Sequence, residues 1–289
     1  MDRGRIGPGL TLILACLTHE RIVVAADRRL TLPDGSCFDD DANKAVFYGG
    51  RVALAYTGLA VLEGMDTADW LAGQLAPFDG IEAAMDAVAG RATQVLKKVH
   101  AVDKRVAFLA SGWATFQAQP PVLPFACLAT NFMDEKGAWL AAAQPAVTVR
   151  TRFLPASRSH SLVVAGQGLY PRELLDLDRM LRRCARHRVG PAPFARLLGT
   201  QSQLVSAGHD ERAARVGPGL VIQALAKEAV LGGSTILLTP LTPAANSFLY
   251  VRSDGATSPF QFPVVVGGGG VFKAYGQELK PGVKSFFEA

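Results

Sequence analysis

The first sixty residues alternate between short apolar runs and polar turns, a pattern typical of β-hairpins. The runs at 11–18 and 22–26 are rich in aliphatic residues and are separated by a short charged turn. A second pair of runs, 44–48 and 52–57, flanks a turn that begins with two glycines. The first two runs are apolar throughout, so their strands are predicted to be buried on both faces.

Helical spacing of apolar residues replaces this pattern further along the chain. Two amphipathic helices are predicted at 59–75 and 80–102, and two more at 171–188 and 192–207. Strand-like runs lie between and after these helix pairs, at 106–110, 125–131, 146–153, 162–165, 220–225, 235–238, 248–252 and 260–266. The order predicts an α+β protein with a four-layer αββα sandwich, in which two sheets stack face to face and helices cover both outer sides.

No repeat and no linker of disordered composition divides the chain, so a single main domain is predicted. Residues 1–10 are small, basic and contain glycine and proline, and are interpreted as an N-terminal extension or propeptide-like segment. The main domain is expected to span 11–240. Residues 241–289 are then a C-terminal extension packed on the same domain.

Composition excludes several classes of function. The net charge of +5 owes much to the arginines between 179 and 188, but no aromatic residues interleave them for base stacking, so nucleic-acid binding is not expected. No apolar run is long enough to span a membrane. The four cysteines are far apart, which fits a reducing cytoplasm, and the five histidines have no metal-ligand spacing. No metal and no cofactor is predicted.

Four residues at the ends of the two hairpins carry the most specific chemistry. Thr11 starts the first strand, Asp27 ends the second, Lys44 starts the third and Gly58 follows the fourth. A threonine hydroxyl becomes a nucleophile when a base removes its proton, and a nearby lysine would lower the pKa of that hydroxyl. An aspartate would hold the lysine, and a glycine N–H could stabilise an oxyanion.

These residues, in this order, resemble the N-terminal nucleophile hydrolases, specifically the proteasome β-subunits and their bacterial relatives. The resemblance is carried by Thr11, the run 22–29 that contains Asp27, Lys44, and the segment 56–59 around Gly58. The segment 165–168 resembles the glycine turn before the third helix of that family, and 216–219 resembles a later glycine turn.

The resemblance implies that Thr11 cleaves peptide or other amide bonds after residues 1–10 are lost. Its own α-amine would then act as the base, and an acyl-enzyme would form on its hydroxyl. The resemblance also implies that substrate is bound by Arg29, Thr31, Gly166 and Gln167. It further implies a homo-oligomer, such as a ring, with the basic helix at 179–188 as a candidate contact.

Three departures from the family pattern keep other functions open. Leu10 stands immediately before the threonine where glycine is usual, and Gln167 replaces a serine. The aspartate and serine of the later turn fall on alanine and valine, at 213–214 and 216, so that Asp210 or Glu211 could substitute only if the loop is reshaped. One alternative is a catalytically silent scaffold or binding subunit. Another is a small-molecule amidase or acylase whose pocket is shaped by 241–289.

Overall fold

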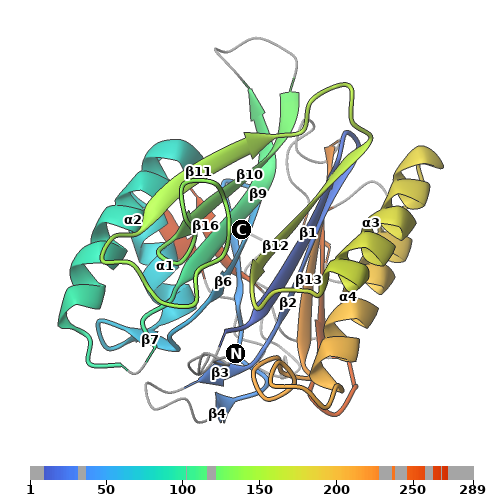
Figure 1. Cartoon of the computed structure of the whole chain (residues 1–289). Coiled ribbons are helices and arrows are strands. Elements are labelled where there is room, and N and C mark those ends of the chain that lie inside the picture. Colours follow the sequence, from blue (N-terminus) through green and yellow to red (C-terminus); the bar gives the residue numbers. More distant parts are fainter. Residues whose placement is uncertain are drawn as a thin grey trace, which may run out of the picture.

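Two β-sheets lie between two pairs of helices in this computed structural model (Figure 1). The structure describes residues 10–31, 37–101, 103–115, 122–227, 236–237, 246–257, 263–267 and 269–272. The predicted turn at 33–36 falls outside the described residues. The first three residues of the strand predicted at 260–266 also fall outside them, and the rest of it lies in the described segment 263–267.

The first sheet has six strands and contains the first hairpin at its centre. In spatial order its strands are β12 (His160–Gly166), β1 (Leu12–Thr18), β2 (Arg21–Asp27), β13 (Leu220–Ala226), β15 (Asn246–Val251) and β14 (Ile236–Leu237). Strands β1, β2 and β13 are almost entirely buried, as expected for apolar strands covered on both faces.

The second sheet has seven strands and contains the second hairpin. In spatial order its strands are β11 (Thr148–Phe153), β10 (Val122–Thr130), β9 (Ala107–Thr115), β6 (Val52–Thr57), β5 (Ala45–Tyr48), β16 (Val264–Gly267) and β17 (Gly270–Phe272). Two small hairpins flank it, β3 (Leu30–Thr31) with β4 (Cys37–Asp39), and β7 (Val61–Leu62) with β8 (Met65–Asp66).

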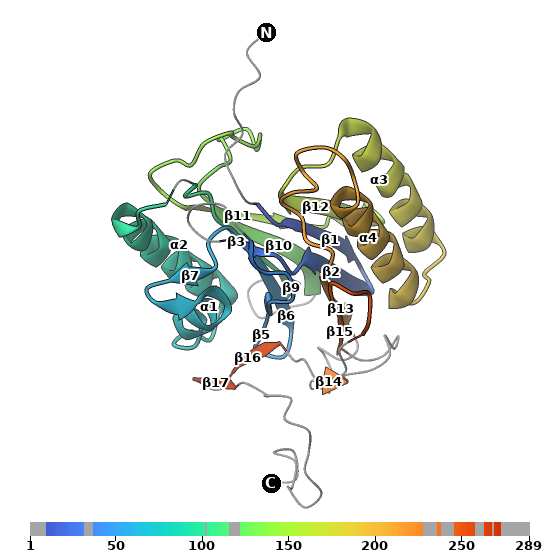
Figure 2. The same ribbon diagram turned by 90° about the horizontal axis from the view of Figure 1, so that it is seen from below.

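The helices form two pairs on opposite outer sides of the sheets (Figures 1 and 2). Helices α1 (Thr67–Leu75) and α2 (Ile81–Lys98) pack on the seven-stranded sheet. Helices α3 (Pro171–Arg186) and α4 (Pro191–Ser206) pack on the six-stranded sheet, and each begins with a proline at its first position. Proline suits this position because the first turn of a helix leaves its N–H groups unpaired.

Three apolar clusters hold these parts together. One joins α1 and α2 to the seven-stranded sheet, a second lies between the sheets, and a third joins α3 and α4 to the six-stranded sheet. The cluster between the sheets is rich in alanine, which lets the two hairpins approach closely at this point. Leu10, which the sequence places in the extension, is buried in this central cluster.

The predicted α+β class is confirmed, and both hairpins lie close to their predicted positions. The helix predicted from 59 begins only at Thr67, so its first part was wrong. Glu63 and Gly64 both have positive φ, and they close the β7–β8 hairpin instead. The Asp66 carboxylate then accepts the N–H of Ala68 and caps α1. Strands within 241–289 complete both sheets.

Candidate active site

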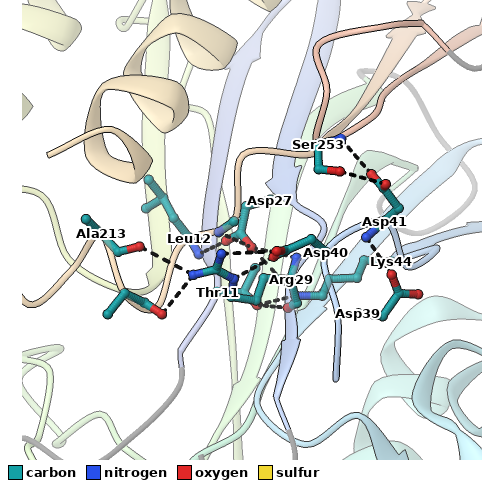
Figure 3. Close-up of polar contacts among 12 residues, drawn as sticks. Thr11, Leu12, Asp27, Arg29, Asp39, Asp40, Asp41, Lys44, Ala213 and Ser253 are labelled. Carbon is teal, nitrogen blue, oxygen red and sulfur yellow. Dashed lines mark hydrogen bonds and ion pairs between the residues drawn. The ribbon is translucent and has the colours of Figure 1, made fainter. Parts of the chain in front are cut away.

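Thr11, Asp27 and Lys44 converge where the two hairpins meet (Figure 3). Thr11 directly precedes β1, and Asp27 is the last residue of β2 in the same sheet. The N–H of Leu12 donates to Asp27 Oδ2 at 2.6 Å, which ties the open end of this hairpin together. Lys44 comes from the other sheet, where it directly precedes β5, and its long side chain reaches across to the first hairpin.

The ammonium of Lys44 is the centre of the cluster. It donates one hydrogen bond to Thr11 Oγ1 and another to the carbonyl oxygen of Arg29. Its Nζ also lies 3.9 Å from Asp27 Oδ1. The Thr11 hydroxyl is within 3.3 Å of the same Arg29 carbonyl. A hydroxyl, an amine and a carboxylate therefore share one small volume, an arrangement in which the amine could activate the hydroxyl as a nucleophile.

Burial sets the electrostatics of this cluster. Thr11 is 4% exposed, Lys44 1% and Asp27 0%. Burial lowers the pKa of Lys44 from 10.5 to about 8, although Asp27 opposes the shift. Burial also raises the pKa of Asp27, opposed by Lys44 and by its backbone N–H donors. A lysine with this pKa can both hold and release a proton near neutral pH.

Asp27 accepts backbone N–H groups from three separate segments. Besides Leu12, these are Arg29 at 3.0 Å and Gly217 at 3.2 Å, both to Oδ1. Gly217 was not among the predicted site residues, although its glycine-rich segment was noted. A Cβ atom at Gly217 would lie 2.7 Å from the Cβ of Arg29, so only glycine lets this loop approach the carboxylate.

The side chain of Arg29, predicted to bind substrate, is engaged within the protein. Its Nε donates to Asp40 Oδ1 at 2.6 Å and its Nη2 to Asp40 Oδ2 at 3.2 Å. Its Nη1 donates to the carbonyl oxygen of Ala214 at 2.8 Å. It is the backbone carbonyl of Arg29 that contacts Lys44 and Thr11. Sequence reasoning did not identify Asp40 as a site residue, although the acidic run 39–41 was its visible signal.

Gly166 and Gln167 contact Thr11 through the main chain. The N–H of Gln167 donates to the carbonyl oxygen of Thr11 at 2.9 Å. Gly166 has φ +81°, and a Cβ atom there would overlap that same carbonyl oxygen. Glycine is therefore required at 166 both for its conformation and for the close approach of Thr11.

Gly58 and Thr31, the remaining predicted site residues, lie in a turn and in a small hairpin. Gly58 follows β6 with φ +115°, and a Cβ atom there would lie 2.5 Å from the Arg105 carbonyl oxygen. Thr67 holds this turn, because its hydroxyl donates to the carbonyl oxygen of Leu59 at 2.8 Å. Thr31 pairs with Cys37 in the β3–β4 hairpin, and its side chain lies outside the described part of the structure.

The two acidic residues considered as substitutes for the later turn do not reach the cluster. Asp210 binds Arg212, which also binds Glu173 at the start of α3. Glu211 is mainly exposed and pairs with Arg215 at 3.8 Å. The loop at 213–217 meets the site through backbone groups: carbonyl oxygens toward Arg29 and one N–H toward Asp27.

A surface hollow of about 420 Å³ adjoins the cluster on the side of Arg29. Its wall combines the end of α4, the 213–218 loop and the 253–255 turn, and its residues are Arg29, Gln203, Ser206, Ala207, Ala213, Pro218, Ser253 and Gly255. Ser253 is held by Asp41 through its N–H and its hydroxyl. Thr11 and Lys44 do not line this hollow, so Arg29 separates it from the nucleophile.

Neither a metal site nor a membrane-spanning helix is present among the residues that the structure describes. In that part of the chain, no group of three or more histidine, cysteine, aspartate or glutamate side chains could hold a metal ion. Among the same residues, no helix is long and apolar enough to cross a membrane.

Comparison with known proteins identifies no family for this chain. No protein-family model matches it, and no curated protein matches it. Solved structures with some likeness include Anbu (ancestral beta-subunit) from Yersinia bercovieri, with 11% identity, a TM-score of 0.46, and coverage of 75% of this chain and 81% of that one.

Two structures from Hyphomicrobium sp. strain MC1 are also similar. The Anbu (Gly-1) mutant has 12% identity and a TM-score of 0.44, and covers 75% of this chain and 81% of its own. A second Anbu structure has 13% identity, a TM-score of 0.42, and coverage of 74% and 82%. At these values the likeness supports no conclusion about activity, substrate or assembly.

These findings correct the expected identity. The prediction that the chain is an N-terminal nucleophile hydrolase of the proteasome β-subunit type was wrong, because the similar structures are Anbu proteins and no family model supports the assignment. The order of Thr11, Asp27, Lys44 and Gly58 suggested that family, but four positions in about fifty residues are too few to identify one. What remains is the geometry of the site itself.

Proposed function

We propose that this chain is a hydrolase of amide bonds, in peptides or smaller molecules, with the hydroxyl of Thr11 as its nucleophile. The observation that carries the proposal is the hydrogen bond from Lys44 Nζ to Thr11 Oγ1 inside a buried cluster with Asp27. Burial of all three side chains favours chemistry over a surface role, because a solvated lysine would keep an ordinary pKa.

The reaction would proceed through an acyl-threonine. As Thr11 Oγ1 attacks the amide carbon, its proton passes to the neutral amine of Lys44, and the leaving amine then takes a proton from the resulting ammonium. Water cleaves the ester to release the acid and restore the hydroxyl. If the Leu10–Thr11 bond is cut, the freed α-amine of Thr11 becomes a second base beside the hydroxyl.

Asp27 and Gly58 have supporting roles in this proposal. Asp27 orients Lys44 and stabilises its ammonium when the proton is held there. Gly58 N–H is the proposed oxyanion donor. This role is supported by the position of Gly58 directly after Thr57, whose methyl lies against the Gly166 turn beside Thr11. Gly166 and Gln167 would position the Thr11 backbone, and Arg29 would act through its carbonyl oxygen.

Access to Thr11 is the main requirement. Leu10 is buried in the core between the sheets, and the Thr11 side chain is almost fully covered. We therefore propose that Thr11 becomes reactive when the segment before it is removed or displaced. The wider proposal also includes the four-layer αββα arrangement, supported by the three separate apolar clusters.

Intact mass spectrometry tests this proposal directly. The purified full chain is measured before and after treatment with p-nitrophenyl acetate, an activated acetyl donor. We expect a mass that lacks residues 1–10, and one acetyl group located on Thr11 by peptide mapping. T11A should take up no acetyl group at that position. A full-length chain in which Thr11 remains unacetylated would overturn the proposal.

A catalytically silent scaffold or binding subunit is the second candidate, and the burial of Leu10 favours it. A leucine packed in the core holds the chain in place before Thr11, as expected if that bond is never cut. In this case T11A would leave any biological effect of the protein intact, whereas the hydrolase proposal requires its loss.

A small-molecule amidase or acylase is a narrower version of the first proposal. The hollow beside Arg29 supports it, because the 253–255 turn of the C-terminal region forms part of its wall. Hydrolysis of short acyl-amides without hydrolysis of casein would distinguish it from a peptidase.

Several broader expectations belong to the same proposal. We propose that the main domain runs from 11 to 240. We also propose a homo-oligomer that uses α3, and the exposed arginines of that helix support the contact. Light scattering at micromolar concentration tests the assembly. The four free cysteines support a cytoplasmic location.

A further inference from the structure

Thr57, the last residue of β6, has a buried hydroxyl without a hydrogen-bond partner among the described residues. The residue is 2% exposed. Buried hydroxyls in folded proteins nearly always have a partner, either in the protein or in ordered water. An unpaired hydroxyl beside a reactive cluster is therefore available to bind a small polar molecule such as water.

The side chain of Thr57 reaches from the seven-stranded sheet to the neighbourhood of Thr11 in the other sheet. A Cβ atom placed on Gly166 would lie 3.1 Å from Thr57 Cγ2 and also 3.1 Å from the carbonyl carbon of Thr11. The methyl of Thr57 and the backbone of Thr11 therefore both lie against the Gly166 turn. Gly58, the proposed oxyanion donor, is the next residue in the chain.

The two branches of this threonine suit different tasks. Its methyl packs against Gly166, which restricts the rotation of a β-branched side chain about χ1. The hydroxyl has no hydrogen-bond partner in the described part of the chain, so it can bind a molecule that comes and goes. A valine would fill the same space without this ability, and a serine would keep the hydroxyl but lose the packing contact.

We propose that Thr57 Oγ1 holds the water molecule that hydrolyses the acyl-threonine. This inference rests on the proposed function. The water oxygen forms a bond to the acyl carbon, and one water proton passes to the neutral amine of Lys44. The ester bond to Thr11 Oγ1 then breaks, and the departing oxygen recovers a proton from Lys44, so that acid, free threonine and neutral amine result.

Ser111 provides a matched control within the same sheet. Its hydroxyl is also fully buried and also lacks a partner among the described residues. In the pairing of β6 with β9, Thr57 lies opposite Ala107, whereas Ser111 lies opposite Ala53, four residues away along the strands. At about 3.3 Å per residue this places Ser111 about 13 Å from Thr57 along the sheet.

The experiment compares wild type, T57V, T57S and S111A with p-nitrophenyl acetate as the acyl donor and T11A as the background. The initial burst of p-nitrophenol measures acetylation of Thr11, and the steady rate measures release. Hydroxylamine is added as a competing acceptor, and acetate and acetohydroxamate are quantified. The partition between these two products reports on the attacking water, which a purely structural role of Thr57 would not change.

We expect T57V to keep the burst, to lose about tenfold or more of the release rate, and to shift products toward acetohydroxamate. T57S should restore most of the acetate, and S111A should match wild type. An unchanged product partition in T57V, or an equal shift in S111A, would overturn the role of Thr57 but not the hydrolase proposal. Loss of the T57V burst together with its thermal stability would assign Thr57 a structural role and also overturn it.

Failure of the proposed function would look different. If wild type showed no burst beyond T11A, the hydrolase proposal would fall, and the role of Thr57 would fall with it. If every variant that retains Thr11 shows a burst and T11A does not, the hydrolase proposal stands. The product partition then decides the role of Thr57.

Discussion

Two ion-paired clusters of this protein differ in a way that separates chemistry from stability. One is Lys44–Asp27 between the hairpins, and the other is Arg212 with Glu173 and Asp210, which links α3 to a surface loop. The second cluster has the shorter contacts, 2.6 and 2.7 Å against 3.9 Å. By distance alone it would be the stronger candidate for a functional site.

Burial and residue type reverse that order. The carboxylates of the surface cluster are about 30% exposed. Burial opposes the charge of Arg212, but the hydrogen bonds that its guanidinium donates to Glu173 and Asp210 raise its pKa even further above an already high value. Arg212 therefore cannot exchange a proton. Lys44 is fully buried and its pKa is lowered to about 8, so it can.

The comparison is tested most severely by removing each cation. K44M should lower the Thr11-dependent acylation rate by about 10²–10⁴-fold, because the base is lost. R212M should leave that rate within about threefold, because its charge only links two surface elements. The initial burst with p-nitrophenyl acetate measures both. Equal losses in the two variants would remove the distinction between the clusters.

Neutralising one carboxylate in each cluster compares how much the two ion pairs stabilise the fold. D27N should lower the free energy of unfolding by about 3–5 kcal/mol, because it leaves a buried ammonium without its counter-ion. D210N should cost about 1 kcal/mol or less, because its pair is partly solvated. Urea denaturation of both variants at neutral pH provides the measurement. A cost in D27N as small as that in D210N would mean that Lys44 is already neutral in the folded protein.

The backbone around Thr11 offers a second contrast, between two neighbouring glycines. G166A should lower the free energy of unfolding by about 3 kcal/mol, because positive φ and overlap with the Thr11 carbonyl both oppose a side chain. G168A should change it by about 0.5 kcal/mol or less, since a Cβ atom there meets nothing within 4 Å. Thermal unfolding of the two variants decides whether the close contact at Thr11 is as tight as described.

The pH dependence of stability tests the lowered pKa of Lys44 directly. The folded-state pKa of Lys44, about 8, lies below its unfolded value of 10.5. Between these values the unfolded chain binds more protons, so wild-type stability should rise with pH from about 8 to about 10.5, by up to about 3 kcal/mol. K44M should lack this rise. A difference between the two proteins that stays constant across the window would contradict the lowered pKa.

Some features of the site could be read from local patterns. The hairpins that carry Thr11, Asp27 and Lys44 follow from apolar runs and a glycine turn, and their positions were predicted closely. The start of α1 was not, because the turn at Glu63 and Gly64 interrupts a sequence that otherwise has helical spacing. Glu63 adopts positive φ where its carboxylate binds Trp70 and Arg91, and local spacing cannot show such contacts.

Other features depend on residues far apart in the chain. Arg29 was predicted to face substrate, but its guanidinium lies between Asp40 and a loop almost two hundred residues away. Gly217 donates to Asp27 across a similar separation. A backbone N–H carries no sequence signal, and any residue except proline supplies one. Only its place in the fold makes it part of the site.

The sequence by itself determined the chemical groups of this protein and the elements that present them: a hydroxyl, a carboxylate and an amine at the ends of two apolar hairpins. Local propensity and the alternation of apolar and polar runs are sufficient for that. Only the tertiary structure shows that the hairpins meet, that the lysine is buried away from water, and that the Thr57 methyl lies against the Gly166 turn beside Thr11. The physical reason is that a pKa and an unpaired hydroxyl depend on what surrounds a side chain in space.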